Sequence, residues 1–123
     1  HAIEKPETVA SAIRIGNPAS WQNAAAARDE SNGIIDMVSD EEIMSAQKRL
    51  ATKAGVFGEP ASAASLAGLI KLRQQGMDFS GKKVVCVITG TGLKDTDVAL
   101  KDTPIFLQLP ADTASVEQAL GWS

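Results

Sequence analysis

The chain has 123 residues, of which 44% are hydrophobic and 22% are charged, and its formal net charge is −3. This composition indicates one globular domain or part of one, and the negative charge argues against a nucleic-acid-binding surface. No apolar run approaches the roughly 20 residues of a membrane span, and no signal-peptide pattern opens the chain. One cysteine and one histidine exclude an internal disulfide, a histidine triad and a Cys/His zinc site. We therefore expect a cytoplasmic protein with no nucleic-acid, membrane or metal partner.

The first quarter of the chain predicts two short helices separated by a break. Small residues favour a short helix over residues 9–13. After the break, Asn17 is suited to be the N-cap of a helix over about residues 18–29, with a proline in the first turn. Asn32 or Gly33 is expected to end this helix in the left-handed conformation.

The next stretch contains the clearest helix signal. Residues 34–38 form a short apolar strand candidate, and Ser39 with Glu42 then has the spacing of a capping box. The helix is predicted to run to about Ala54, where Gly55 stops it. Its apolar face, at helical spacing, comprises Ile43, Ala46, Leu50 and Ala54.

Another helix is predicted to open at Glu59 and to end before Gly76. Its first turns hold only small residues, several of them serines, and its apolar face begins further on. Such a start suits close approach by a ligand or by another backbone. It equally suits a tightly packed helix end with serine caps, and both readings stay open at this point. The expected apolar face contains Leu66, Leu69 and Ile70.

Residues 84–89 are an unbroken apolar, β-branched run followed by a glycine-rich turn. This pattern predicts a strand that is buried on both faces of a parallel sheet, with Cys86 as a buried, inert thiol. Ligands bind at the carboxyl ends of such strands, and glycine lets the backbone approach them closely. From the residues alone, Thr89 is either a ligand contact or a strand-end cap.

The last quarter predicts a short helix from about Lys94 to Leu100, an extended segment over 105–109 and a final helix capped by Asp112. Trp122 is expected to pack this tail against the body of the protein. The order of elements predicts an α/β fold in which helices link parallel strands. Because only two or three strands are present, the other strands of the sheet are expected to come from elsewhere.

Three stretches resemble the threonine synthase family, in that family's order and at its spacing. They are residues 8–21, 59–69 and 87–95. The first is specific to threonine synthase, whereas the other two also resemble wider fold-type II pyridoxal-phosphate enzymes. The resemblance covers residues 6–103, and the tail over 104–123 matches less well. One departure is Thr91, where the family more often has asparagine or histidine.

The resemblance implies that residues 1–123 form the C-terminal portion of a tryptophan-synthase-β-like large domain. Such a portion is a partial three-layer α/β/α arrangement with a parallel sheet. The implied reaction converts O-phospho-L-homoserine and water to L-threonine and phosphate. The implied cofactor is pyridoxal 5′-phosphate (PLP), which acts as an electron sink. A homo-oligomer, in the form of a dimer, is also expected.

By motif, the resemblance places Thr89 at the pyridine nitrogen of PLP, with Gly90 beside it. The turn from Glu59 to Ser62 is expected to wall the cofactor ring. Glu59 is either an orienting or proton-relay group or a structural carboxylate bonded to backbone amides. The turn at Ala12 is expected to line the site mainly through its backbone.

The family's Schiff-base lysine and its Gly-Asn-rich phosphate loop do not occur among these residues. No catalytic residue is therefore assigned here, and the chain alone is expected to be inactive. Lys94 is a poor substitute, because the family's lysine does not lie in this motif. Arg14 is either a ligand of the substrate phosphate or a member of a structural ion pair. Two other functions stay open: a different fold-type II enzyme such as threonine dehydratase, against which residues 12–21 argue, and a non-catalytic interaction module.

Overall fold

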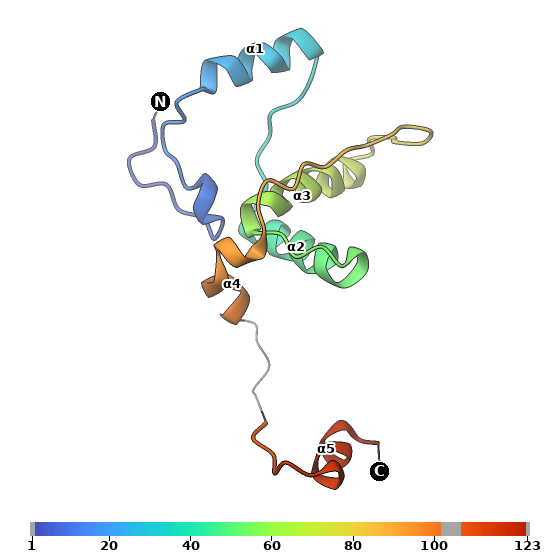
Figure 1. The fold of residues 1–123 in the computed structure, drawn as a ribbon. Coiled ribbons are helices and arrows are strands. Elements are labelled where there is room, and N and C mark those ends of the chain that lie inside the picture. The colour runs from blue at the N-terminus through green and yellow to red at the C-terminus, as the bar shows by residue number, and fades with distance from the viewer. Residues whose placement is uncertain (1, 102–106, 123) are drawn as a thin grey trace.

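The computed structural model describes residues 2–101 and 107–122. Two long helices, α2 (Asp40–Ala54) and α3 (Pro60–Gln74), pack against each other at its centre, and a 3-10 turn, η1 (Ser11–Ile13), contacts α3 (Figure 1). The other helical elements are α1 (Trp21–Ser31), η2 (Gly92–Lys94), α4 (Thr96–Lys101) and α5 (Thr113–Leu120). In Figure 1, α1 and α5 stand apart from the α2–α3 pair. Over the described ranges, no helix combines the length and the apolar character that crossing a membrane requires.

The interface between α2 and α3 is built mainly from small side chains. Ile43 and Ala46 of α2 and Ala63 and Ala67 of α3 are at most 2% exposed. Alanines allow two helices to pack at a short interaxial distance. The predicted face of α2 is therefore confirmed at its first two positions, whereas Ala54 is exposed. In α3 the innermost positions are alanines rather than the expected leucines, because the close helix contact leaves room only for small groups there. Partly buried residues around this core are Val38, Leu50, Ala61, Ala64, Leu66 and Ile70.

The predicted helix ends of α2 are confirmed. The Ser39 hydroxyl accepts a hydrogen bond from the Glu42 N–H at 3.2 Å, and the Glu42 carboxylate accepts one from the Ser39 N–H at 2.7 Å. This is the reciprocal capping box that the spacing indicates. Gly55 ends α2 with φ 66°, and Asn32 ends α1 with φ 51°. Local sequence signals therefore determine these three ends.

Removing one half of the capping box tests its contribution. Ser39→Ala leaves an amide of the first turn of α2 without its acceptor, so we expect the free energy of unfolding to fall by about 1 kcal/mol. Urea unfolding, followed by circular dichroism, measures the change. Ser45→Ala, at an exposed position of the same helix, is the matched control, with an expected change within about 0.5 kcal/mol. Equal effects of the two variants would contradict the capping role.

The start of α1 differs from the prediction. The helix begins at Trp21 rather than near Pro18, so Asn17 is not its N-cap. The preceding backbone is held in another way, because the Gly16 carbonyl accepts a hydrogen bond from the Ile3 N–H at 2.9 Å. The helix therefore starts three residues later than the pattern suggests, with Ser20 as its N-cap.

Residues 34–38 and 84–89 have no β-ladder in the part of the chain that the structure describes, where the only β-pairing is an isolated antiparallel bridge between Gly58 and Thr91. The predicted parallel sheet is therefore not confirmed. A β-ladder needs a second extended backbone beside the first. The neighbour of residues 84–89 is instead the helix α3, whose Ser65 hydroxyl donates to the Val87 carbonyl. Cys86 is only partly buried. The exposed fractions of the valines are 46% at Val84, 84% at Val85 and 65% at Val87.

The C-terminal helix has the predicted cap but not the predicted packing. The Asp112 carboxylate accepts hydrogen bonds from the Ser115 N–H at 2.9 Å and the Ser115 hydroxyl at 2.8 Å. These two bonds lower the pKa of Asp112 below its ordinary value. Trp122 is 76% exposed, so its expected packing against the body is wrong. Of the extended segment predicted over 105–109, the first two residues lie outside the described ranges.

Candidate functional site

Two turns meet where the extended segment reaches the start of α3. One turn precedes α3, and the other is the glycine-rich turn that follows residue 89. Backbone groups hold them together, so their relative position does not depend on exposed side chains. The contacts are the two hydrogen bonds of the Gly58–Thr91 bridge, from the Glu59 N–H to the Gly90 carbonyl at 3.0 Å and from the Gly92 N–H to the Phe57 carbonyl at 2.9 Å.

Ser62 ties α3 to the end of the extended segment. Its side chain is 1% exposed, and its Oγ accepts a hydrogen bond from the Gly90 N–H at 2.8 Å. The same oxygen lies 3.0 Å from the Gly90 carbonyl and 3.1 Å from Thr89 Oγ1. Thr89 itself is exposed, and Ser62 is the hydrogen-bond partner of its hydroxyl. Ser62, Thr89 and Gly90, which the sequence predicts for the site, therefore lie together. The backbone of Gly90 is what closely approaches the small residues at the start of α3.

Glycine at position 90 leaves room for a neighbouring side chain. A Cβ there would lie 2.7 Å from Cδ of Glu59 and closer still to Oε1. Glu59 is 6% exposed, and within the described ranges its carboxylate has no hydrogen-bond partner. The backbone-amide bonds expected of a structural carboxylate are thus not observed in that part of the chain. Nor do any three His, Cys, Asp or Glu side chains of the described residues form a group that could hold a metal ion.

The turn that contains Ala12 lies beside the glycine-rich turn. The Ser11 hydroxyl donates to the Asp95 carboxylate at 2.6 Å, which joins η1 to the end of η2. Ala12 is exposed next to this contact. The Arg14 guanidinium donates two hydrogen bonds to the Thr8 carbonyl, at 3.0 and 2.6 Å, so a backbone oxygen takes the place of the anticipated carboxylate partner.

Gln47 supports the site and was missed by sequence reasoning. It is 8% exposed, and its Nε2 donates to the Gly58 carbonyl at 2.9 Å. The available signal was a polar residue four positions after Ile43, on the buried face of a helix, since buried polar groups nearly always have partners. Gln47 therefore holds the turn before α3 in place from the side of α2.

Gln47→Leu preserves the approximate size of the side chain and removes the donor. The Gly58 carbonyl then loses a buried hydrogen bond, and we expect the free energy of unfolding to fall by about 1–3 kcal/mol. Denaturant unfolding gives the value. Gln74→Leu, at an exposed position of α3, should change it by less than about 0.5 kcal/mol. A Gln47→Leu protein as stable as wild type would remove this support role.

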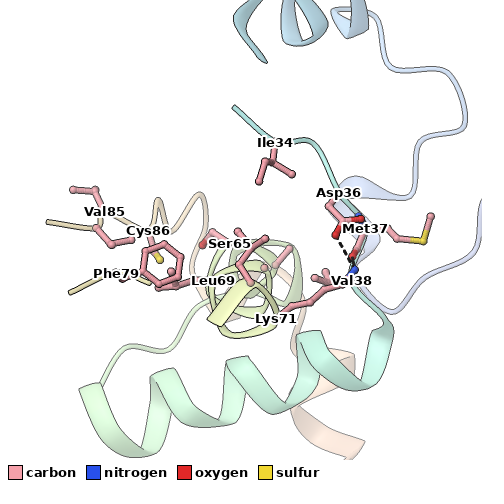
Figure 2. A pocket seen from close by; sticks show the side chains of 14 residues that line it. Ile34, Asp36, Met37, Val38, Ser65, Leu69, Lys71, Phe79, Val85 and Cys86 are labelled. Atoms are coloured by element: carbon pink, nitrogen blue, oxygen red, sulfur yellow. Dashed lines mark hydrogen bonds and ion pairs between the residues drawn. The ribbon is translucent and has the colours of Figure 1, made fainter. Parts of the chain in front are cut away.

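A mainly apolar groove of about 370 Å³ lies along another part of α3 (Figure 2). Its lining includes Ile34, Leu69, Phe79 and Val85. At one end, the Lys71 ammonium pairs with the Asp36 carboxylate at 2.9 Å. The hydrogen bond from Lys71, followed by that from the Met37 amide, lowers the pKa of Asp36 below its ordinary value. The groove offers hydrophobic packing rather than the polar groups gathered around Ser62.

The chain is similar to known proteins over most of its length. Residues 1–90 match the family described as "Pyridoxal-phosphate dependent enzyme". The chain is 56% identical over 105 residues to the threonine synthase of Bacillus sp. (strain ULM1), which aligns 85% of this chain with 30% of that protein. It is 50% identical over 119 residues to the threonine synthase of Mycobacterium bovis, and these residues are 97% of this chain and 33% of that protein. To the threonine synthase of Methanocaldococcus jannaschii it is 44% identical over 117 residues, which are 95% of this chain and 29% of that protein. The chain spans about a third of the length of these curated relatives.

The residues gathered around Ser62 fit the cofactor of this family. A pyridine nitrogen needs a polar partner, and the exposed Thr89 hydroxyl, anchored from behind by Ser62, presents one. Gly90 has no side chain that would obstruct a planar ring beside this hydroxyl. The family match covers residues 1–90, which is more than half of the chain. The chain belongs to the family of pyridoxal-phosphate dependent enzymes.

Proposed function

We propose that this chain is the carboxyl-side part of a threonine synthase, which converts O-phospho-L-homoserine and water to L-threonine and phosphate. The observation that carries the proposal is the cluster of Ser62, Thr89 and Gly90, which presents a hydroxyl at the end of an extended segment. Identities of 44–56% to threonine synthases support the choice within the family. When bound, PLP supplies an electron sink for the reaction.

In this proposal the chain's own residues position one side of the cofactor. Thr89 meets the ring nitrogen through a neutral hydroxyl, which moderates the electron sink compared with a carboxylate. The backbone contacts between the two turns keep Thr89 and Glu59 on a common frame. Glu59, buried and without a bonded amide among the described residues, is suited to orient the ring or to act in a proton relay.

The same proposal includes a larger sheet. Exposed valines on an unpaired extended segment, residues 84–89, are the surface that neighbouring strands and a covering helix layer would bury. Residues 1–123 would then be the C-terminal portion of a three-layer α/β/α large domain with a parallel sheet. A cytoplasmic homodimer is the assembly that we propose for the whole enzyme.

Product analysis tests the proposal. The full-length enzyme that carries this segment, loaded with PLP, should release inorganic phosphate from O-phospho-L-homoserine and form L-threonine. Formation of 2-oxobutyrate from threonine without phosphate release would instead identify a threonine dehydratase. Failure to bind PLP at all would favour a non-catalytic interaction module. The 123-residue chain alone should release no phosphate above the buffer background.

A further inference from the structure

Asp40 links the start of α2 to residues that lie 31 and 32 positions earlier in the chain. Its Oδ1 accepts a hydrogen bond from the Thr8 hydroxyl at 2.6 Å, and its Oδ2 accepts one from the Val9 N–H at 3.1 Å. The capping box of α2 consists of Ser39 and Glu42. The Asp40 side chain is therefore available to hold the amino-terminal segment, and both of its oxygens do so.

Thr8 extends this attachment to the whole turn over residues 8–14. Its hydroxyl donates to Asp40 and accepts a hydrogen bond from the Ala10 N–H at 3.2 Å. Its carbonyl accepts two hydrogen bonds from the Arg14 guanidinium, at 3.0 and 2.6 Å. Both ends of the turn are therefore held to one residue, and that residue is held to α2.

Apolar packing gives this turn a place but not an orientation. Ala10 is 0% exposed and belongs to the α2–α3 core, whereas residues 11–15 are exposed. One buried methyl group makes a non-directional contact, but hydrogen bonds to a carboxylate are directional and strong. On the side of the glycine-rich turn, the Asp95 carboxylate accepts a bond from the Ser11 hydroxyl at 2.6 Å. Two carboxylates, one from α2 and one from the end of η2, therefore determine how the turn is oriented.

We propose that Asp40 is a positioning residue that sets the place of residues 8–14 relative to the glycine-rich turn. The consequence for the cofactor rests on the proposed function, in which the backbone around Ala12 lines one side of the PLP site. Asp40 acts through Thr8 and has no contact of its own with the cofactor. An amide has one acceptor oxygen where a carboxylate has two, so Asp40→Asn removes one of the two bonds and keeps the shape of the side chain.

Amide hydrogen exchange of the full-length enzyme, measured by mass spectrometry, tests the attachment. Asp40→Asn should raise the exchange rate of residues 9–14 by about tenfold, as expected for the loss of one hydrogen bond to a charged group. Residues 47–54, in the second half of α2, should be unchanged. Glu41→Gln is the matched control, because it removes a carboxylate from the same helical turn, where Glu41 interacts with Ser39 and its own backbone.

The distribution of the exchange decides between positioning and helix stability. Faster exchange spread evenly along α2 would show that Asp40 only stabilises its own helix, and would overturn the inference. An effect of Glu41→Gln on residues 9–14 as large as that of Asp40→Asn would overturn it as well.

Titration with PLP, followed by the absorbance of the bound cofactor, tests the consequence for the site. Asp40→Asn should raise the Kd of PLP by about tenfold. Thr8→Val should have a similar effect, and the double variant should be weaker than either single variant by no more than about twofold, since both act on one contact. Thr8→Ser restores the hydroxyl and should bind PLP as the wild type does.

The remaining outcomes separate this inference from the proposed function. If Asp40→Asn does not fold, the comparison of Thr8→Val with Thr8→Ser decides, and equal exchange and equal PLP affinity in the two would refute the inference. Unchanged PLP affinity in a folded Asp40→Asn enzyme would refute the positioning of the cofactor site. Phosphate release by the wild type supports the proposed function whatever the variants do. A wild type that binds no PLP overturns the proposed function and the consequence for the cofactor, whereas hydrogen exchange still decides whether Asp40 positions the turn.

Discussion

Gly90→Ala is expected to reduce phosphate release from O-phospho-L-homoserine by about 100-fold or more in the full-length enzyme. The new methyl group would overlap the Glu59 carboxylate, with Cδ only 2.7 Å away. Relief requires a shift of the Glu59 carboxylate, the far end of a flexible side chain, away from its position beside Gly90. A displacement of about 1 Å in a positioned group is enough for a loss of this size. The accompanying overpacking should lower the free energy of unfolding by about 1–3 kcal/mol.

Two further variants test the cause of this loss. Gly68→Ala places a methyl group on α3 with no atom within 4 Å, so activity should be unchanged and stability should rise by about 0.5–1 kcal/mol. Glu59→Ala combined with Gly90→Ala removes the overlapping carboxylate and should restore part of the PLP binding, measured by cofactor absorbance. An active Gly90→Ala enzyme would show that the contact with Glu59 does not constrain the site.

Thr89→Val is expected to have the second-largest effect. The substitution keeps the shape of the side chain and removes the hydroxyl that bonds Ser62 and, in the proposed function, meets the ring nitrogen. Loss of one such polar contact corresponds to about 1–3 kcal/mol, or a fall of about 5–150-fold in kcat/KM. Thr89→Ser should recover most of the activity, because the hydroxyl is restored.

The neighbouring threonine supplies the matched control. Thr91 is exposed, and its hydroxyl accepts only a long hydrogen bond of 3.5 Å from the Leu93 N–H. Thr91→Val should therefore change the activation free energy by less than about 0.5 kcal/mol. Steady-state phosphate release with all three variants provides the comparison. If the effects at positions 89 and 91 were equal, the special role of Thr89 would be lost.

Features set by short-range sequence signals were predictable. The capping box of α2, the left-handed end at Gly55 and the Asp112 cap each involve residues within a few positions of one another. The start of α1 was predicted less well, since the helix begins after Ser20 and not after Asn17. The strand over 84–89 depends on a partner backbone, and its own residues carry no information about where that partner lies.

The candidate site shows the same division. The positions of Thr89 and Ser62 were anticipated because both stand in recognisable motifs, at a strand-like end and at a helix start. The hydrogen bond between Gln47 and the Gly58 carbonyl was not, since it depends on how closely α2 packs against α3. The environment of the Glu59 carboxylate, which has no partner in the described ranges, also follows from packing, because the sequence alone left its backbone bonds undecided.

The hydrogen bond between Ser11 and Asp95 has a consequence for the order of folding. It joins positions that are 84 residues apart, so it closes a long loop whose entropy must be overcome. The helices α2 and α3 are neighbours in the chain and contact each other, so this pair can form earlier from local contacts. During synthesis, the amino-terminal turn therefore has to wait for Asp95 to leave the ribosome. The turn that contains Ala12, on one side of the proposed cofactor site, should be among the last parts of this segment to become ordered.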